Sequence, residues 1–263
     1  MSENAKRRAL LEKQKNGYDV MSAEELKACH EFNEDYKYFI DAAKTEREAV
    51  DYAVEAAKAA GAKGVCTGTP LRRDLFEGRR EEGLRICGFT GSKPVLMMTG
   101  GSLGAQAVNA ALRQALPQLI QVFDIAHLCG KGNLDESLMG MKGYCQKEFL
   151  SDEMPDALAV ADVVLSRAGS NTLSELLALH KPMLLVPYPL GASRGDQIEN
   201  AKSYARQGLA RVLMQEDMTA RTLTDALFKL LDERAELLAA LEAYPVKDGT
   251  QAVLELIEDA RKK

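Results

Sequence analysis

The stretch 161–175, ADVVLSRAGSNTLSE, most constrains what this chain can fold into. Its apolar run at 163–165 is typical of a fully buried parallel strand, and Gly169 with Ser170 supplies a turn into a helix. In an open α/β sheet such loops lie at the carboxyl ends of the strands, where ligands bind, and the unpaired N–H groups that begin the helix attract anions. The stretch therefore predicts a ligand-binding edge, with Glu175 one turn inside the helix.

The same residues permit a second interpretation. Thr172-Leu-Ser-Glu175 fits a capping box, in which the two side chains satisfy the backbone at the start of a helix and nothing is bound. From this stretch alone, both interpretations stand.

Composition narrows the class of protein. The 263 residues, 46% of them hydrophobic, can build one large or two modest domains, and a net charge of -5 gives no case for nucleic acid. The five cysteines are scattered without a C-x-x-C pair, so we expect reduced thiols rather than disulfides or a zinc site. No apolar run approaches the ~18 residues of a membrane span, and the charged N-terminus does not lead into a signal-peptide core. We therefore expect a cytoplasmic protein without a transmembrane segment.

Residues 1–62 carry only helical patterns. Ser22-Ala-Glu-Glu25 and Thr45-Glu-Arg-Glu48 each fit a capping box in front of an amphipathic segment, and Gly61 fits the end of the second helix. We expect a helical hairpin, which must dock on the rest of the chain or on a partner because two amphipathic helices cannot bury both faces alone.

Part of this segment, 38–50 (YFIDAAKTEREAV), carries a resemblance of its own. Residues 1–60 resemble the N-terminal region of zinc aminopeptidases of the aspartyl-aminopeptidase type. That family's metal ligands are His, Asp and Glu residues far downstream, and nothing in this sequence corresponds to them. A lone helix histidine such as His30 is more often a surface residue than a ligand. We therefore expect neither peptidase activity nor a bound metal.

After residue 62, strands alternate with helices, which is the signature of βαβ units. We expect an α/β domain over 63–263, with a Rossmann-like parallel sheet and helices on both faces, preceded by the helical hairpin. Residues 77–91 are polar and glycine-spotted, so we expect a loop there. The expected strands are 65–67, 94–99, 123–129, 144–150, 163–165 and 183–188.

The strand expected at 94–99 runs into Gly100-Gly-Ser-Leu-Gly-Ala105, where glycines let the backbone approach a ligand closely. This loop lacks the full G-x-G-x-x-G spacing, and no acidic residue closes a following strand, so an NAD-dependent oxidoreductase is disfavoured. His127 alternates with Ile125 on the next strand, and we expect a packed histidine rather than a metal ligand.

Five motifs, taken together, resemble the MurG family of bacterial glycosyltransferases, which add N-acetylglucosamine to lipid I in peptidoglycan synthesis. The similarity runs in order from 65 to 245 and implies the C-terminal, donor-binding half of a two-domain, inverting GT-B enzyme. The motifs are Thr67-Gly-Thr-Pro-Leu-Arg72, Thr99-Gly-Gly-Ser-Leu-Gly-Ala-Gln106, Glu148-Phe-Leu150, Ser166-Arg-Ala-Gly-Ser-Asn-Thr-Leu-Ser-Glu175 and Asp196-Gln-Ile-Glu-Asn200.

The resemblance implies UDP-N-acetylglucosamine as the ligand, with no cofactor. Glu175 would accept hydrogen bonds from the ribose hydroxyls, while Phe149 and Leu150 would border the uracil. The diphosphate would lie against the glycine loop and Arg72. The remaining residues of the implied site are Gly101, Ser102 and Gly104 in that loop, Gly169, Ser170 and Thr172 at the start of the helix, Asp196, Gln197 and Asn200 at the sugar hydroxyls, and Arg167, which could equally tie its loop to the helix.

The sequence also departs from the family. In the MurG family an N-terminal domain of similar size carries a Gly-Gly-Thr-Gly-Gly-His loop, thought to supply the catalytic base, with the acceptor site and a membrane-associating patch. The helical segment 1–62 stands in its place, so the chain looks like a chimera of two unrelated fragments. We expect donor binding without transfer, and no catalytic residue in this chain.

Two other functions stay open. The chain could be a complete transferase together with a separate acceptor-domain chain. Alternatively, it could be a non-catalytic interaction module, whose helical hairpin docks a protein partner and whose nucleotide site is vestigial.

Overall fold

The computed structural model describes residues 16–42, 46–100, 105–191 and 195–262. The chain divides into two compact units, an N-terminal unit (Met1–Cys66) and a C-terminal unit (Thr67–Lys263).

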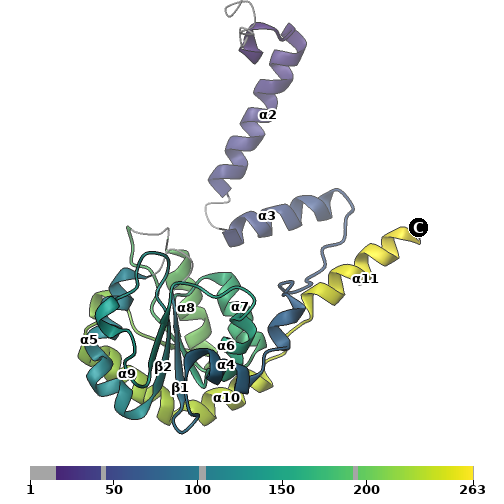
Figure 1. Ribbon diagram of the computed structural model, residues 1–263. Coiled ribbons are helices and arrows are strands. Elements are labelled where there is room, and N and C mark those ends of the chain that lie inside the picture. The colour runs from purple at the N-terminus through teal and green to yellow at the C-terminus, as the bar shows by residue number, and fades with distance from the viewer. Residues whose placement is uncertain (1–15, 43–45, 101–104, 192–194, 263) are drawn as a thin grey trace, which may run out of the picture. The chain divides into compact units, whose positions relative to one another are not determined.

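The N-terminal unit is built from helices (Figure 1). A short 3-10 turn, η1 (Gly17–Asp19), precedes α2 (Ala23–Ala42) and α3 (Glu46–Ala59). The predicted capping box at the start of α2 is confirmed, because the Ser22 N–H donates to Glu25 at 2.8 Å and the Glu25 N–H donates to the Ser22 hydroxyl at 3.2 Å. The box predicted at Thr45 lies outside the described residues. Gly61 adopts a left-handed φ of 81° just after α3, as a helix-ending glycine does.

The C-terminal unit contains a six-stranded parallel sheet in the order β3-β2-β1-β4-β5-β6. This arrangement confirms the predicted Rossmann-like α/β fold. The strands are β1 (Val95–Thr99), β2 (Asp124–Leu128), β3 (Tyr144–Lys147), β4 (Val163–Ser166), β5 (Met183–Leu185) and β6 (Arg211–Val212).

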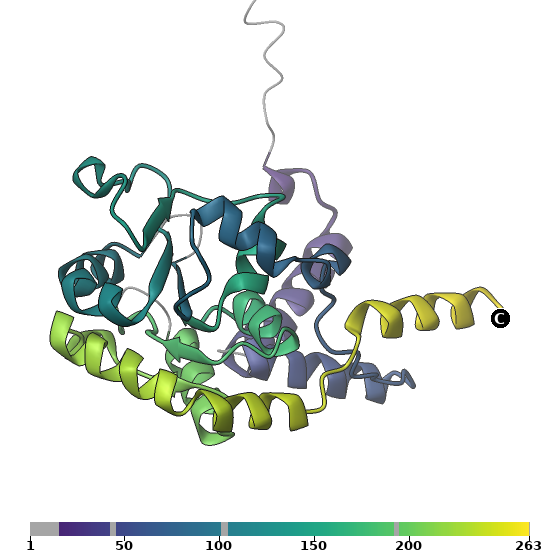
Figure 2. The same cartoon turned by 60° about the horizontal axis from the view of Figure 1, so that its bottom comes forward.

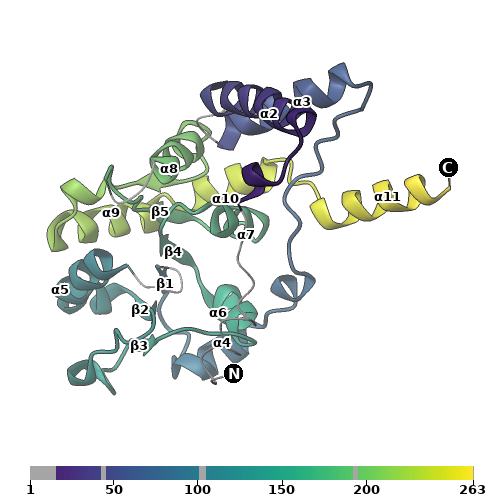
Figure 3. The same ribbon diagram turned by 90° about the horizontal axis from the view of Figure 1, so that it is seen from above.

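Helices cover both faces of this sheet, with α5 and α9 on one side and α4, α6 and α7 on the other (Figure 3). The helices are η2 (Arg73–Phe76), α4 (Arg80–Cys87), α5 (Gln106–Val122), η3 (Glu136–Leu138), α6 (Met154–Val160), α7 (Ser170–Ala178), α8 (Asp196–Arg206), η4 (Gln215–Asp217), α9 (Ala220–Asp232), α10 (Arg234–Ala243) and α11 (Gly249–Arg261). A single residue separates α9 from α10, which follow one another along the sheet (Figure 2).

The side chains of the central strand β1 explain why helices cover both faces of the sheet. Leu96 and Met98 pack into the core shared with α5 and α9, whereas Met97 packs into the core shared with α6 and α7. Consecutive side chains of a strand point to opposite faces, so a run of apolar residues requires a helix layer on each side.

Two of the predicted elements are wrong. Residues 65–67 form no strand, and the sixth strand is instead β6, a two-residue pairing of Arg211 and Val212 with β5. The segment expected as a loop contains α4. Its Gly83 is needed for packing, because an added Cβ would lie 2.3 Å from the Asp156 carbonyl oxygen of α6. A glycine that the sequence presents as a loop signal is therefore a point of close helix contact.

None of the helices in the described part of the chain has the length and apolarity that a membrane span requires.

Candidate functional site

The carboxyl ends of the parallel strands meet at one edge of the sheet. In the register, Thr99 of β1 pairs with Leu128 of β2 on one side and with Ser166 of β4 on the other. The chain runs from β1 outward through β2 and β3, and then returns to place β4 on the opposite side of β1. Ligands of open α/β sheets bind at such a switch point, outside the carboxyl ends of the strands.

The loop after β4 leaves the start of α7 accessible. Ser170 begins the helix, Gly169 is its N-cap, and no side chain caps it. A Cβ added to Gly169 would meet nothing within 4 Å, and the Ser170 side chain is exposed. Among the described residues no side chain caps the N–H groups of the first turn, and such groups favour an anion.

This helix boundary decides between the two interpretations of the stretch. A capping box would need Thr172 at the N-cap position, but α7 begins at Ser170, which places Thr172 and Glu175 inside the helix. The capping interpretation is wrong, and Glu175 is available for another role.

Glu175 is half-buried, and no hydrogen bond to its carboxylate is present among the described residues. Burial raises its pKa, an effect that Arg72 opposes and Asp74 reinforces. A carboxylate that is partly desolvated without a hydrogen-bond donor is an energetic cost to the fold. A carboxylate in this state is typical of a binding site, where a ligand supplies the missing hydrogen bonds.

Arg72 lies near enough to influence this carboxylate because the segment after Cys66 contacts α7. The Ser174 hydroxyl of α7 lies 3.2 Å from the Thr69 hydroxyl. Arg72 follows three residues later with 60% of its side chain exposed, and its guanidinium lies 3.5 Å from the Asp74 carboxylate. The fold therefore brings Arg72 and Glu175, which are distant in sequence, close enough for the charge of Arg72 to lower the pKa of Glu175.

The Arg167 guanidinium is held within the protein. Its side chain is 6% exposed, and its guanidinium donates to the Val186 and Pro187 carbonyls at 3.0 and 3.2 Å and to Gln215 at 2.7 Å. It also lies 4.0 Å from the centre of the Tyr188 ring. Arg167 therefore ties the end of β4 to the segment after β5 and to η4.

Two amides of α8 hold the loop that precedes α7. The Gln197 carbonyl oxygen accepts from the Ala168 N–H at 3.3 Å, and also from the Tyr188 N–H at 3.4 Å. Asn200 donates to the Ala168 carbonyl at 3.1 Å. These contacts place Gln197 and Asn200 beside Gly169. Asp196, in the first turn of α8, is exposed.

The loop after β3 also lies at this edge. Strand β3 ends at Lys147, earlier than predicted, and Phe149 beyond it is 63% exposed. Leu150 packs partly into the core. An exposed aromatic ring next to an anchored leucine is available to a planar ligand.

The glycine loop after β1 is described only at its ends. Gly101, Ser102 and Gly104 lie outside the described residues. At the near end, a Cβ added to Gly100 would lie 2.7 Å from the Ala105 nitrogen. Only glycine therefore fits at position 100.

Some residues that shape this edge gave no local signal in the sequence. Tyr188 and Gln215 hold Arg167 across separations of 21 and 48 residues, and Thr69 meets α7 across 105. Among the described residues, no group of three or more His, Cys, Asp or Glu side chains is placed to hold a metal ion.

The glycosyltransferase family 28 C-terminal domain model matches residues 95–253. The chain belongs to this family. Its sequence is 48% identical over 197 residues to the UDP-N-acetylglucosamine--N-acetylmuramyl-(pentapeptide) pyrophosphoryl-undecaprenol N-acetylglucosamine transferase of Geobacillus thermodenitrificans, covering 75% of this chain and 55% of that protein. It is 47% identical over 198 residues to transferase 2 of the same name from Bacillus cereus, covering 75% and 56%.

Solved structures agree with the family 28 assignment. The crystal structure of Acinetobacter baumannii MurG matches with a TM-score of 0.56 and 28% identity, over 65% of this chain and 53% of that one. The glycotransferase of kitacinnamycin shares the fold, with a TM-score of 0.53 over 74% of this chain and 49% of that one, at 21% identity. The chain spans about half the length of the curated relatives it matches. These matches support the resemblance of the C-terminal region, and they give no support to the aminopeptidase resemblance of residues 1–60.

Proposed function

We propose that the C-terminal unit binds UDP-N-acetylglucosamine at the carboxyl edge of its sheet, as the donor-binding half of an N-acetylglucosaminyltransferase of peptidoglycan synthesis. The observation that carries the proposal is the geometry around α7. An uncapped helix start at the switch point lies next to a half-buried carboxylate without a hydrogen-bond donor among the described residues. The activity named for relatives with 46–48% identity supports the choice of sugar nucleotide.

The charge distribution of the site fits the two parts of a nucleotide. Glu175 would accept the ribose hydroxyls, which would supply the hydrogen bonds that its desolvated carboxylate lacks. The diphosphate would lie at the start of α7 near Ser170 and Thr172, where helix N–H groups and the exposed Arg72 carry positive charge. In this arrangement no metal is required to neutralise the diphosphate. Gly101, Ser102 and Gly104 complete the proposed diphosphate contacts.

The remaining predicted residues frame the base and the sugar. Phe149 and Leu150 would border the uracil. Gln197 uses its amide oxygen on the loop backbone, which leaves its N–H₂ group for a sugar hydroxyl, and Asn200 has its amide oxygen left for the same purpose. Asp196 would lie alongside. Arg167 is left out of the proposed contacts because its guanidinium is already bound within the protein.

The acceptor of the sugar is a substrate of the full-length relatives. We propose that it reaches the C-terminal unit from the cytoplasmic side of the cell membrane. General-base catalysis needs a group within hydrogen-bond reach of the acceptor hydroxyl, and in GT-B enzymes the opposite domain supplies it. The described residues of the N-terminal unit form only η1, α2 and α3, which do not make a second Rossmann-like domain. We therefore expect the purified 263-residue chain to bind the donor without transferring its sugar. A rate near ~1 s⁻¹ on a soluble lipid I analogue, within the ordinary enzyme range, would contradict this expectation.

The test is calorimetric titration of the full chain with UDP-N-acetylglucosamine, UDP, UDP-glucose and NAD. The proposal expects binding of the first two, while binding of NAD alone or of nothing contradicts it. A chain that binds no nucleotide would instead support the interaction module, with a protein partner docked on the N-terminal helices.

Glu175→Gln provides the residue-level test, with Glu199→Gln as its matched control. The Glu199 carboxylate is 68% exposed on α8 and pairs with Lys202 at 3.2 Å. Loss of a charged hydrogen bond costs ~1.5–3 kcal/mol, so we expect UDP affinity to fall about 10- to 150-fold for Glu175→Gln. The control should bind as the parent chain does. The Tm of Glu175→Gln should not fall, because the substitution removes a desolvated charge, and unchanged affinity would contradict the assignment.

A further inference from the structure

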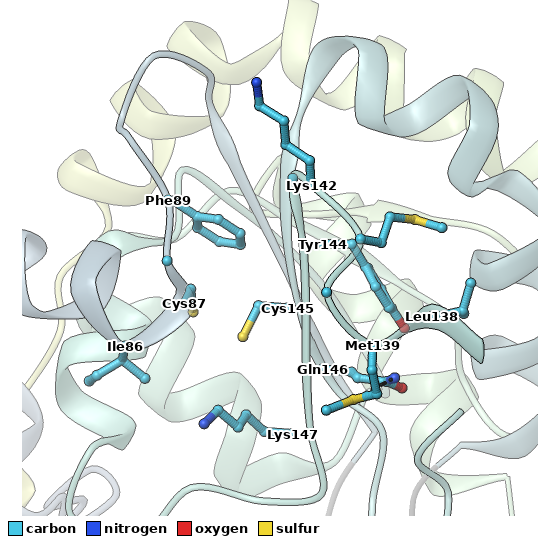
Figure 4. A pocket seen from close by; sticks show the side chains of 14 residues that line it. Ile86, Cys87, Phe89, Leu138, Met139, Lys142, Tyr144, Cys145, Gln146 and Lys147 are labelled. Atoms are coloured by element: carbon cyan, nitrogen blue, oxygen red, sulfur yellow. Dashed lines mark hydrogen bonds between the residues drawn. The ribbon is translucent and has the colours of Figure 1, made fainter. Parts of the chain in front are cut away.

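A cleft of about 510 Å³ opens beside the edge strand β3, between the end of α4 and the segment 138–147 (Figure 4). It shares no lining residue with the proposed nucleotide site. Its volume is within the range of small-molecule sites. The family 28 function does not account for this cleft.

Two cysteines from different elements face each other in the cleft (Figure 4). Cys87 is the last residue of α4, and Cys145 is the second residue of β3. Tyr144 and Gln146 point to the opposite face of the sheet, where Tyr144 contacts His127 at 2.8 Å. Because side chains alternate along a strand, Cys145 and Lys147 share the face that α4 covers. Both cysteines are half-buried, so small solutes reach them through the cleft.

The surroundings of the pair distinguish its two sulfur atoms. The hydrogen bond from the Cys87 thiol lowers the pKa of Cys145 to about 7, and the Lys147 ammonium acts in the same direction against the effect of burial. The same contact, together with burial and the Glu153 carboxylate, raises the pKa of Cys87. The negative end of the α4 dipole also disfavours a thiolate at Cys87. Cys145 is therefore the more acidic thiol of the pair, and Cys87 is the hydrogen-bond donor to it.

We propose that Cys145 and Cys87 form an oxidation site that reacts with hydroperoxides to give a disulfide between α4 and β3. The Cys145 thiolate attacks the terminal oxygen of the hydroperoxide, and the O–O bond breaks as the S–O bond forms. The leaving alkoxide or hydroxide takes a proton from solvent and departs as alcohol or water. The sulfenic acid that forms on Cys145 is then attacked by the Cys87 sulfur, the S–O bond breaks, and water leaves. The two thiols lose two electrons, which the hydroperoxide gains.

The expected rate follows from two opposing effects. The lowered pKa of Cys145 raises its thiolate fraction at pH 7 above that of an ordinary thiol. The intrinsic nucleophilicity of a thiolate falls with its pKa at a slope of only ~0.5, so the gain in thiolate fraction outweighs the loss of nucleophilicity. Cys145 should therefore react faster than an ordinary cysteine. Cys129 is fully buried with a raised pKa and should react more slowly still.

The experiment treats the reduced full chain with hydrogen peroxide at pH 7 and maps the products by peptide mass spectrometry. We expect a Cys87–Cys145 cross-link within one chain, lost in Cys145→Ser. In Cys87→Ser, we expect a sulfenic acid on Cys145 that dimedone traps. Cys29→Ser, which removes a cysteine of the N-terminal unit, is the matched control and should keep the cross-link.

Other outcomes would overturn the proposal. They are a Cys145 that stays a thiol while the other cysteines oxidise, a Cys145 cross-link to any cysteine except Cys87, or a trapped sulfenic acid on Cys145 in the parent chain without a cross-link. If a serine variant fails to fold, the presence or absence of the Cys87–Cys145 cross-link in the parent chain tests the proposal.

Discussion

Acid should destabilise the C-terminal unit through His127, a residue on β2 with no exposed surface. Its Nε2 lies 2.9 Å from the Asn109 side-chain oxygen, and its Nδ1 lies 2.8 Å from the Tyr144 hydroxyl. Asn109 uses its N–H₂ group on the Cys129 carbonyl at 2.8 Å, which leaves its oxygen to accept from the ring. The network therefore fits a neutral imidazole that donates from Nε2 and accepts from Tyr144 at Nδ1.

The size of the acid-induced loss of stability follows from the linkage between protonation of His127 and folding. Burial, and then the nearby Arg113 guanidinium, lowers the pKa of His127 to about 3, against 6.5 for an unperturbed side chain. Between these values the folded state binds fewer protons than the unfolded state, so stability falls as the pH falls. From pH 7.5 to pH 5 the free energy of unfolding should drop by ~2 kcal/mol from this residue. That loss is nearly the same for any folded-state pKa at or below ~4.

Urea unfolding of the parent chain and of His127→Gln at pH 7.5 and pH 5 measures the effect. Glutamine does not titrate, so the variant should lose ~2 kcal/mol less than the parent chain over this interval. His30→Gln, at an exposed position of the N-terminal unit, should behave as the parent chain does. If His127→Gln does not fold, NMR titration of the parent chain replaces it, and the His127 ring should stay neutral down to pH 5. Equal acid losses in both chains, or a ring that titrates near 6.5, would refute the reasoning.

Three further perturbations test the packing of the C-terminal unit. The Asp162 carboxylate is 13% exposed and binds Arg80 and Arg234 at 3.0 and 3.1 Å. Asp162→Asn should therefore lower the free energy of unfolding in urea by ~3 kcal/mol, a figure that allows for the partly exposed arginines. A loss below ~1 kcal/mol would mean that these ion pairs do not stabilise the fold. Burial lowers the pKa of Lys181 to about 8 from 10.5, so the folded state binds fewer protons than the unfolded state between these values. The free energy of unfolding of the parent chain should therefore rise relative to that of Lys181→Met as the pH rises from 8 to 10.5. If the two chains show the same pH dependence of stability, the lowered pKa of Lys181 is refuted. Gly83→Ala should lower the free energy of unfolding by ~1–3 kcal/mol, because its methyl group would lie 2.3 Å from an α6 carbonyl oxygen; a gain in stability, as helix propensity alone expects, would mean that α4 and α6 separate freely.

Much of the fold could be predicted from the sequence because several buried strands consist of continuous apolar residues. Five of the six strands lie within segments that the sequence predicts as strands, and β1, β4 and β5 follow apolar runs such as Val163 to Leu165. Strand β6 could not be found this way, because two residues carry no periodicity and Arg211 joins the sheet only through backbone pairing with Leu184. Helix α4 was hidden by Gly83, a helix breaker in isolation that here permits contact with α6.

For the candidate site, the sequence by itself determined the kind of edge that forms. Small-residue turns after buried strands place helix N-termini and polar side chains at the carboxyl end of a parallel sheet. Only the tertiary structure decided which of those side chains are still available. Arg167 is bound by carbonyls 19 and 20 residues away, and Gln197 by loop N–H groups, whereas Glu175 meets no hydrogen-bond donor in the described part of the chain. Hydrogen bonds over such separations depend on how strands and helices pack, and local residue spacing does not encode that packing.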